Sequence, residues 1–321
     1  MLALRPTPGR GRQLGRLIRE DSSQDHASVL EWTTQENNVE HGAIKFSLIL
    51  ATVGRSEDLA RFLQHLDQQT YRNFELIVVD QNQDGILDPL IRQYKEKFPL
   101  LHLRSERGLS RARNVGLQHF SGDVVAFPDD DCWYAPETLE KVARAFYENL
   151  NCDGFTGRGV DDSRPADYIS FSRQSGLINK KNVWRRGISY AIFLRANVVR
   201  VVGPFDESLG VGSGSGKYSA EETDYLIRAI NSRFRIQYCT DLCIFHRHPA
   251  LNYDLALIKK SYGYSVGFGY VLRKHNYPIS FVVYCWLRAL GGAAVSLFTF
   301  NFAKSRFHFA ALKGRVLGWL A

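Results

Sequence analysis

The stretch Arg107–Tyr134, RGLSRARNVGLQHFSGDVVAFPDDDCWY, contains the pattern that decides the fold. Its apolar run Asp123–Phe127 has the composition of a buried strand, and the acidic triplet Asp129-Asp130-Asp131 follows directly. Ligands gather at the carboxyl ends of strands in a parallel sheet, and adjacent carboxylates repel one another unless a cation compensates them. Asp-x-Asp in this position suits Mg²⁺ or Mn²⁺ carrying a diphosphate. The alternative is a solvated acidic loop before a helix that opens at Pro136-Glu137.

The first part of the same stretch predicts a helix that begins with positive charge. Gly108–Gly116 has Arg111 and Arg113 in its first turns, where cations oppose the helix dipole. An anionic partner would offset this unfavourable arrangement. The alternative is a basic helix face that contacts only solvent.

Around this stretch, short apolar runs alternate with segments of helical periodicity. The expected strands in the first half are Ile44–Ala51, Phe74–Val79, Leu100–Leu103 and Asp123–Phe127. Strands that alternate with helices of about 10–15 residues predict a parallel α/β sheet, and their nearly continuous apolar character predicts cover on both faces.

Beyond Leu150 the alternation is looser. We expect strands at Ile188–Leu194 and Arg235–Phe245, a helix at Glu221–Ile230, and a flexible glycine-rich loop at Gly203–Gly216 close to a site.

Further polar side chains stand where the predicted strands and helices end or begin. Asp80 ends the second strand, where it can bind a base or a ribose or form a turn. Glu221, Glu222 and Asp224 open a helix, where acids are favourable in any case, although one of them can be a general base. His246 and His248 share one face at the end of a strand, and either can complete an Asp/Asp/His metal set or lie in solvent.

Composition and missing motifs exclude several classes. The chain has 321 residues, of which 45% are hydrophobic and 23% charged, which excludes collagen-like and wholly disordered chains. Five scattered cysteines indicate reduced thiols in a cytosolic setting. A complete phosphate-binding loop and a Gly-x-Gly-x-x-Gly motif after the first strand are both missing, which disfavours an NTPase and a dehydrogenase.

In this order, the motifs resemble family 2 glycosyltransferases with the GT-A fold, and the tail resembles bacterial exopolysaccharide-type members. The resemblance runs from about Lys45 to His248 and is most specific over the opening stretch. It implies a Rossmann-like nucleotide-diphospho-sugar transferase sandwich with a mostly parallel central sheet. Two positions differ from the usual pattern: Glu222 stands where the family has Asp, and Gln81 replaces a second acid after Asp80.

The resemblance also implies roles for individual residues. The nucleotide would be bound by a group of side chains at the strand ends and on the basic helix: Thr52, Asp80, Arg113, Asp129 and Asp130. Mn²⁺ or Mg²⁺ would be bound by Asp131 and Asp129, with His246 nearby. Glu222 would be the catalytic base, with Glu221 and Asp224 as the alternatives.

The implied activity is inverting transfer from a UDP-, GDP- or dTDP-sugar to an acceptor hydroxyl. The expected acceptor is a lipid-linked saccharide in bacterial surface polysaccharide synthesis. Two alternatives belong to other classes: a non-catalytic membrane-bound scaffold with the same fold, and a nucleic-acid-binding protein that uses its basic tail. The tail interleaves basic residues with apolar runs, so we expect no nucleic acid partner.

The domain organisation follows from these patterns. We expect a disordered leader at residues 1–42, the catalytic domain at 43–250 and a helical membrane-associating region at 251–321.

The last region has nine Lys or Arg and one acid. Its net charge is therefore +8, the same as that of the whole chain. Ile279–Ala303 has only one charge, Arg288, and Gly291-Gly292 could bend it into a re-entrant hairpin. We therefore expect a peripheral, re-entrant or single-pass protein on the cytoplasmic face of the inner membrane, with anionic lipid as a partner. The alternative is a buried helical subdomain.

Overall fold

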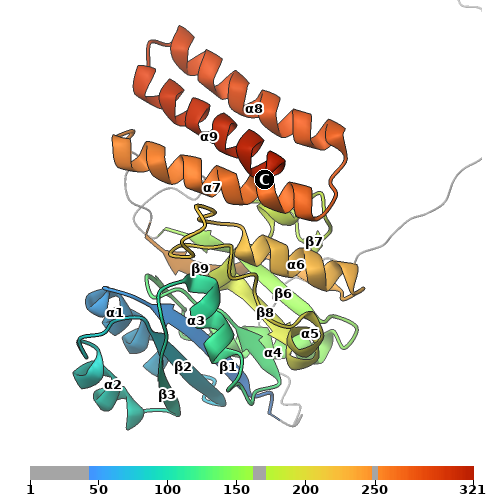
Figure 1. The fold of residues 1–321 in the computed structure, drawn as a ribbon. Coiled ribbons are helices and arrows are strands. Elements are labelled where there is room, and N and C mark those ends of the chain that lie inside the picture. The colour runs from blue at the N-terminus through green and yellow to red at the C-terminus, as the bar shows by residue number, and fades with distance from the viewer. Residues whose placement is uncertain (1–42, 162–170, 248–251) are drawn as a thin grey trace, which may run out of the picture.

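The computed structural model describes residues 43–161, 171–247 and 252–321, so the predicted leader lies outside the described residues. One mixed sheet has helices on both faces, and three long C-terminal helices are stacked above it (Figure 1). The predicted α/β sandwich followed by C-terminal helices is confirmed.

The sheet has the strand order β3-β2-β1-β4-β8-β6-β9-β5, and β7 pairs with β9. The strands are β1 Phe46–Thr52, β2 Phe74–Asp80, β3 Leu100–Arg104, β4 Val124–Ala126, β5 Cys132–Trp133, β6 Gly154–Val160, β7 Gly176–Leu177, β8 Ile192–Arg195 and β9 Ile236–His246. Strands β3, β2, β1 and β4 are parallel, as predicted, and so are β6 and β9. Antiparallel pairing enters through β8, β5 and β7.

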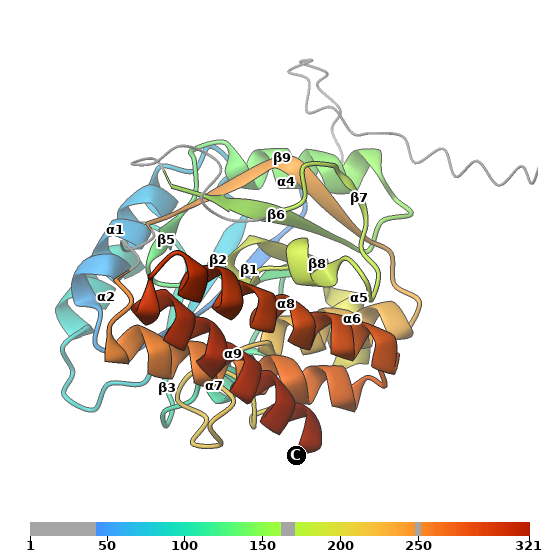
Figure 2. The same ribbon diagram turned by 90° about the horizontal axis from the view of Figure 1, so that it is seen from above.

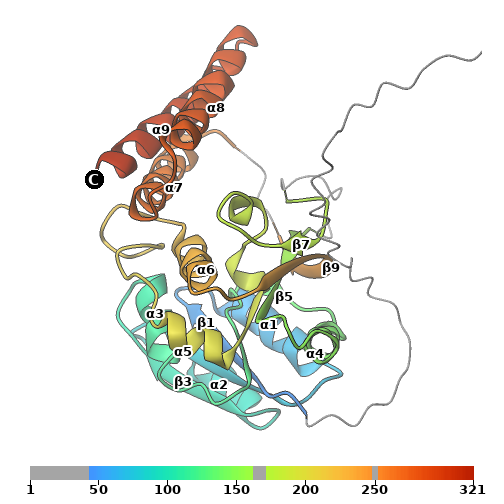
Figure 3. The same ribbon diagram turned by 90° about the vertical axis from the view of Figure 1, so that its right-hand side faces the viewer.

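Helices cover both faces of the sheet, and successive residues of a strand point to opposite faces. They are α1 Ser56–Asp67, α2 Asp88–Lys95, α3 Leu109–Gly116, α4 Thr138–Glu148, α5 Ala196–Val202 and α6 Glu221–Asn231. Leu48 and Leu50 of β1 pack in one apolar cluster with α1 and α4, whereas Ile49 packs in a second cluster with α3, α5 and α6 (Figure 3). Complete burial of each large apolar side chain contributes about 1.5–3 kcal/mol, so both faces must be covered.

The segment predicted as the strand Ile188–Leu194 is only partly extended. Residues Ser189–Ala191 form a 3-10 turn, and β8 begins at Ile192. The turn directs the Ser189 hydroxyl to Asp129 and stacks the Tyr190 ring on His246. In a continued strand these two neighbouring side chains would point to opposite faces and could not make both contacts.

The glycine-rich loop Gly203–Gly216 joins α5 to α6 and packs against the beginning of α3. Its five glycines all have positive φ, which other residues rarely adopt. The backbone N–H of Leu109 donates to the Val211 carbonyl at 2.9 Å, and the Ser110 hydroxyl donates to the Leu209 carbonyl at 2.7 Å. The loop therefore covers the N-terminus of the basic helix.

The tail forms α7 Leu255–Lys274, α8 Ile279–Phe298 and α9 Phe302–Leu320, with α7 nearest the sheet (Figures 1 and 2). Helix α8 continues through Gly291-Gly292, so the suggested bend at these glycines is wrong. The chain reverses instead after α8, where Phe300 has a φ of 55°. Among the described residues, α8 is the one helix long and apolar enough to cross a membrane. Its apolar segment has a mean hydropathy of 1.6 and is 28% buried.

Helices α7 and α9 approach each other closely because glycines line their contact. A Cβ atom on Gly318 would lie 2.0 Å from the Val266 carbonyl oxygen, and one on Gly269 would lie 2.3 Å from the Arg315 carbonyl oxygen. No side chain fits at these distances. By contrast, Gly291 of α8 has nothing within 4 Å of its Cβ position.

Candidate active site

Parallel pairing brings the predicted strand-end residues to one edge of the sheet. In the register of β1 and β2, Thr52 lies opposite Asp80, and an isolated parallel bridge joins Ala51 to Asp129. The Thr52 hydroxyl donates a hydrogen bond of 2.7 Å to Oδ2 of Asp130. The predicted nucleotide-binding and metal-binding side chains therefore lie along one line of strand ends.

Asp80 is fully buried, and its oxygens are bonded to its neighbours. Oδ1 accepts from the backbone N–H and the side-chain amide of Asn82, and Oδ2 lies 3.1 Å from Nε2 of His102. Gln81, which follows it, accepts a hydrogen bond of 2.7 Å from the backbone N–H of Gly108. Asp80 thus fixes the loop after β2, and Gln81 fixes the start of α3.

The third acid of the triplet is held by a histidine and an arginine. Pairing of Cys132 with His246 between β5 and β9 brings the imidazole Nε2 within 3.2 Å of Oδ1 of Asp131. Arg55 also pairs with Asp131. Burial opposes ionisation of this carboxyl, but the hydrogen bonds and charges of His246 and Arg55 lower its pKa to about 2. Asp131 is therefore ionised across the physiological range.

The other two acids of the triplet have different surroundings. Burial raises the pKa of Asp130 to about 6, although the Thr52 hydroxyl and the Arg55 guanidinium at 3.0 Å favour its charged form. Burial also raises the pKa of Asp129, which Arg113 opposes. Three adjacent carboxyl groups thus differ in how readily each one carries charge.

Arg113 joins the acidic triplet to the beginning of α6. Its Nη2 donates to Oδ1 of Asp129 at 2.9 Å and its Nη1 to Oε1 of Glu221 at 3.2 Å, and only 1% of its side chain is exposed. The anionic partner predicted for the basic helix is therefore present within the protein. Arg111, in contrast, is exposed and pairs with Glu106 and Glu207, as expected for a solvated face.

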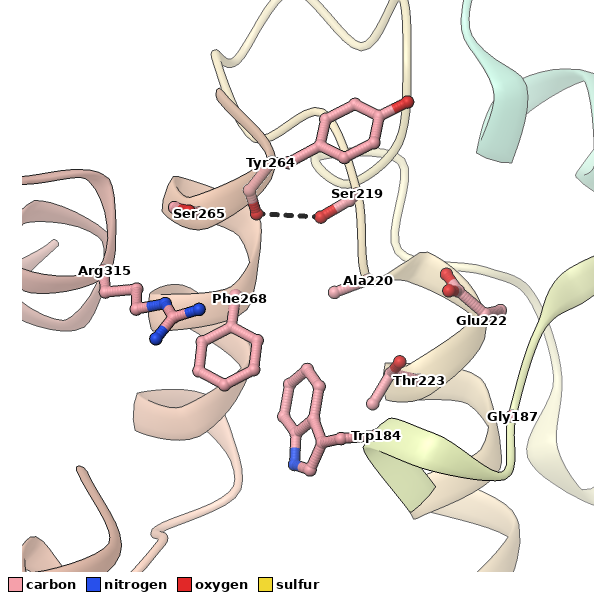
Figure 4. A pocket seen from close by; sticks show the side chains of 10 residues that line it. All are labelled: Trp184, Gly187, Ser219, Ala220, Glu222, Thr223, Tyr264, Ser265, Phe268 and Arg315. Carbon is pink, nitrogen blue, oxygen red and sulfur yellow. Dashed lines mark hydrogen bonds between the residues drawn. The ribbon is translucent and has the colours of Figure 1, made fainter. Parts of the chain in front are cut away.

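The three acids of α6 have separate surroundings. Glu221 is the partner of Arg113, whereas Glu222 lines a cavity of about 260 Å³ between α6 and the tail helices (Figure 4). Burial and the adjacent Glu221 carboxylate raise the pKa of Glu222 to about 8. Glu222 therefore exchanges its proton much closer to neutral pH than Asp224 does, as a candidate general base requires.

Asp224 points elsewhere. Its fully buried carboxylate accepts from Arg228 at 2.9 Å, lies 2.8 Å from Nζ of Lys274 and 2.8 Å from Nε2 of His275. Burial opposes its charge, but the bonds from His275 and Lys274 lower its pKa to about 2. This cluster attaches α6 to the end of α7, and the structure does not bring Asp224 to the acidic triplet.

The donor atoms near Asp131 fit a divalent metal that shares its coordination with a ligand. Asp131 offers a carboxylate oxygen and His246 an imidazole nitrogen, which are donors that suit Mn²⁺ or Mg²⁺. Both oxygens of Asp129, the other predicted ligand, accept hydrogen bonds from Arg113 and Ser189. Within residues 43–161, 171–247 and 252–321, no group of three or more His, Cys, Asp or Glu side chains is arranged to hold an ion. Ligand phosphates would therefore complete the coordination. His248 lies outside the described residues.

Sequence reasoning missed several side chains at this site. Arg55 follows β1 only three residues after Thr52, so its position at the same edge could have been inferred. Ser189, which donates to Oδ2 of Asp129 at 3.1 Å, carries no local signal. The same is true of Trp184 and of Tyr264 from α7, which line the cavity beside Glu222.

Residues 47–198 match the sequence profile of Glycosyl transferase family 2. An uncharacterized glycosyltransferase of Haemophilus influenzae is 35% identical over 107 residues, which are 33% of this chain and 35% of that protein. Glycosyltransferase AglE of Haloferax volcanii is 26% identical over 227 residues, which are 67% of this chain and 70% of the relative. The match thus spans about a third of the first relative and just over two thirds of the second.

Solved structures share the fold. Mannosyltransferase PcManGT from Pyrobaculum calidifontis, in complex with GDP-Man and Mn²⁺, has a TM-score of 0.58 at 15% identity, over 89% of this chain and 91% of that one. S. aureus TarS 1-349, in complex with UDP-GlcNAc, has a TM-score of 0.53 at 17% identity, over 84% and 90%. At such identities the likeness concerns the fold, and the predicted GT-A-type architecture is confirmed.

Proposed function

We propose that the protein, whose residues 47–198 match the profile of Glycosyl transferase family 2, transfers a sugar from a nucleotide-sugar donor to an acceptor hydroxyl with inversion. The observation that carries this proposal is the bridge made by Arg113. It connects Asp129 of the acidic triplet with Glu221, the residue next to Glu222. A candidate diphosphate site and the beginning of the helix that carries a candidate base are thereby joined by one buried side chain.

In the proposed reaction, the carboxylate of Glu222 removes the proton of the acceptor hydroxyl. The acceptor oxygen bonds to the anomeric carbon while the bond from that carbon to the diphosphate oxygen breaks. The electron pair leaves with the nucleoside diphosphate, and the configuration at the anomeric carbon inverts. The raised pKa of Glu222 suits a base that must hold this proton. Glu221 would instead keep Arg113 in position, and Asp224 would hold α7.

The donor would lie along the strand ends. Thr52 and Asp80 would line the nucleotide pocket, Asp129 and Asp130 would bind toward the ribose, and Arg113 would balance the diphosphate charge. Asp80 would act through Asn82, because its own oxygens are already bonded. UDP, GDP and dTDP are all candidate nucleotides, since complexes of similar structures contain GDP-Man and UDP-GlcNAc.

A divalent ion, Mn²⁺ or Mg²⁺, would be held by Asp131 and His246 with Asp129 nearby. When bound, it would neutralise charge on the departing diphosphate. Arg55, which pairs with both Asp130 and Asp131, would keep these carboxylates in place before the donor arrives.

The acceptor is proposed to be a lipid-linked saccharide for surface polysaccharide, reached from the cytoplasmic face of a membrane. The support comes from α8, whose exposed side chains are mainly apolar. The most exposed of these on α8 and the following turn are Ile279 at 58%, Leu287 at 59%, Val295 at 64%, Phe298 at 83% and Phe300 at 80%. An apolar surface of this kind indicates contact with lipid or with another protein.

Two experiments test the proposed function. Thermal-shift measurements with UDP-, GDP- and dTDP-sugars plus Mn²⁺ should show stabilisation by one donor class. Release of the nucleoside diphosphate and NMR of the product should then show transfer with inversion. If no donor stabilises the protein and none is consumed with membrane extracts as acceptor, a scaffold with the same fold is the better interpretation.

Membrane association is tested by fractionation. The full-length protein should sediment with membranes, and high salt alone should not release it, because the proposed contact is apolar as well as electrostatic. Exchange of two exposed apolar residues of α8, Leu287→Asp with Val295→Asp, should move the protein to the soluble fraction. Recovery of the wild type as a monodisperse protein without detergent would contradict the proposal.

A further inference from the structure

A cavity of about 260 Å³ lies between the catalytic domain and the tail helices. Figure 4 shows Glu222 and Thr223 of α6 on one side and Phe268 and Arg315 of the tail on the other. This volume is close to the lower end of the range for small-ligand sites, about 300–1,000 Å³. It suits one sugar unit with its phosphate and not an extended chain.

Arg315 of α9 is the unusual side chain of this cavity. Its Nη1 donates to the carbonyl of Cys285 in α8 at 2.6 Å, and its guanidinium lies 4.9 Å from the centre of the Phe268 ring. Its Nε is buried with no hydrogen-bond partner among the described residues, and no described carboxylate forms an ion pair with it. The charge of Arg315 is thus stabilised by a ring and a carbonyl alone.

Some buried arginines of this protein have carboxylate partners, whereas Arg186, like Arg315, has a carbonyl and a ring as partners and a buried Nε without one. Arg113 has the carboxylates of Asp129 and Glu221, and Arg228 has that of Asp224. A partly buried cation without a counter-charge is unfavourable, so an anion that enters the cavity would be bound strongly. The planar guanidinium matches phosphate oxygens in particular. Arg288 of α8 adds positive charge close to Arg315.

Aromatic rings form the wall between the two ends of the cavity. Trp184, in the 3-10 turn η1 Val183–Arg185, packs on Phe268 with ring centroids 4.1 Å apart. The indole N–H donates to the Tyr277 hydroxyl at 3.1 Å, and that hydroxyl donates to the Lys180 carbonyl at 2.6 Å. Trp184 is therefore fixed in orientation, and its flat surface can support the apolar face of a sugar ring.

We propose that this cavity binds a phosphate-bearing acceptor, with its phosphate on Arg315 and its sugar against Trp184 and Phe268. The acceptor hydroxyl then faces Glu222. This assignment rests on the proposed function and names the chemical class of its second substrate. It also gives the tail a second role: α7 and α9 complete the acceptor site, and α8, bonded to Arg315 through Cys285, lies where a lipid carrier would continue.

The assignment is tested by calorimetric titration of the full-length protein in detergent, with the donor nucleotide from the thermal-shift screen present to fill the donor site. The probes are farnesyl diphosphate, inorganic pyrophosphate and uncharged farnesol. Arg315→Gln should weaken binding of farnesyl diphosphate about 10- to 100-fold, the effect of losing a charged hydrogen bond. Lys313→Gln, an exposed change of equal charge on the same helix, should have no effect.

Each outcome has a defined meaning. If farnesyl diphosphate binds and pyrophosphate does not, the cavity recognises the phosphate of a lipid head group. If both bind equally, the cavity recognises phosphate alone. Equal affinity of wild type and Arg315→Gln, or equal affinity for farnesol and its diphosphate, overturns the assignment. If Arg315→Gln does not fold, Arg315→Lys is used instead, because it keeps the charge but lacks the planar guanidinium group. This variant should bind farnesyl diphosphate more weakly than wild type. Failure of the proposed function is distinct, because it appears as missing donor binding in the thermal-shift screen.

Discussion

The strand-end cluster and the helical tail handle charge in opposite ways. At the ends of β1, β4 and β9, each buried cation has an acidic partner, as Arg113 has in Asp129 and Glu221. In the tail, the only acid from residue 252 onward is Asp254, and Arg315 lies beside a ring and a carbonyl. The charges of the first region are paired within the protein. In the tail, Lys274 pairs with Asp206 and Asp224, whereas Arg315 would be paired by the proposed acceptor. In the proposed function, the donor end of the reaction is therefore set by the sheet, and the acceptor end depends on the helices.

The largest expected effect is at the strand ends. Asp131→Ala should lower kcat about 10⁴-fold, equal to about 5 kcal/mol, because the ligand that would hold the metal is removed. Asp241→Ala, an exposed acid on β9, is the matched control and should keep wild-type activity. EDTA should abolish activity of the native enzyme, and Mn²⁺ should restore it. Persistence of activity in the variant and in EDTA would remove the metal assignment.

Next in size is the loss of the proposed base. Glu222→Gln should lower kcat by about 10²–10⁴ and leave the Kd of the donor nucleotide unchanged, because Glu222 faces the acceptor cavity. Glu221→Gln should instead weaken donor binding, since it releases Arg113. If Glu222→Gln keeps normal kcat while Glu221→Gln or Asp224→Asn loses it, the role of the base moves to the affected residue.

Asp80→Ala tests whether the nucleotide end depends on the loop after β2. Removing a buried carboxylate that three donors approach should weaken donor binding by roughly 1–3 kcal/mol, or about 5- to 150-fold in KM. The Tm should fall as well, because Asn82 and His102 lose their partner. A lower Tm with an unchanged KM would make Asp80 purely structural.

The pH dependence of kcat gives a smaller effect of defined sign. The base acts in its ionised form, and burial with the Glu221 carboxylate raises the pKa of Glu222 to about 8. The titratable and charged groups around it are Glu221, Arg113, Asp129, Tyr264 from α7 and, across the cavity, Arg315 from α9. We expect kcat to rise about tenfold between pH 7 and pH 9. A profile that is flat over this range would show that another group accepts the proton.

The smallest effect on the donor end should come from the tail. Gly318→Val forces α9 away from the Val266 carbonyl and should reduce the free energy of unfolding by about 1–3 kcal/mol. The Kd of the donor nucleotide should not change, while transfer to the acceptor should fall. Gly291→Val, at an open position on α8, is the control and should leave both unchanged. An equal loss of donor binding in Gly318→Val would contradict the separation of the two regions.

The sequence by itself determined the α/β order and the main strand-end acids. Apolar runs such as Phe74–Val79 form strands that are buried on both faces, and the acid that follows this run, Asp80, then lies at the sheet edge. The period of Leu59, Phe62, Leu63 and Leu66 likewise predicted α1, where all four are buried. These strands and helices depend on residues that are close together in the chain, so the local sequence pattern is enough to predict them.

Only the tertiary structure decided how the acids of α6 divide their tasks and what the tail does. Glu221, Glu222 and Asp224 are equivalent in sequence, but one bonds to α3, one lines the cavity and one bonds to α7. Arg315 lies 93 residues beyond Glu222 and reaches the same cavity because glycines let α9 pack against α7. Contacts between segments so far apart depend on how whole helices pack, and local periodicity carries no record of them.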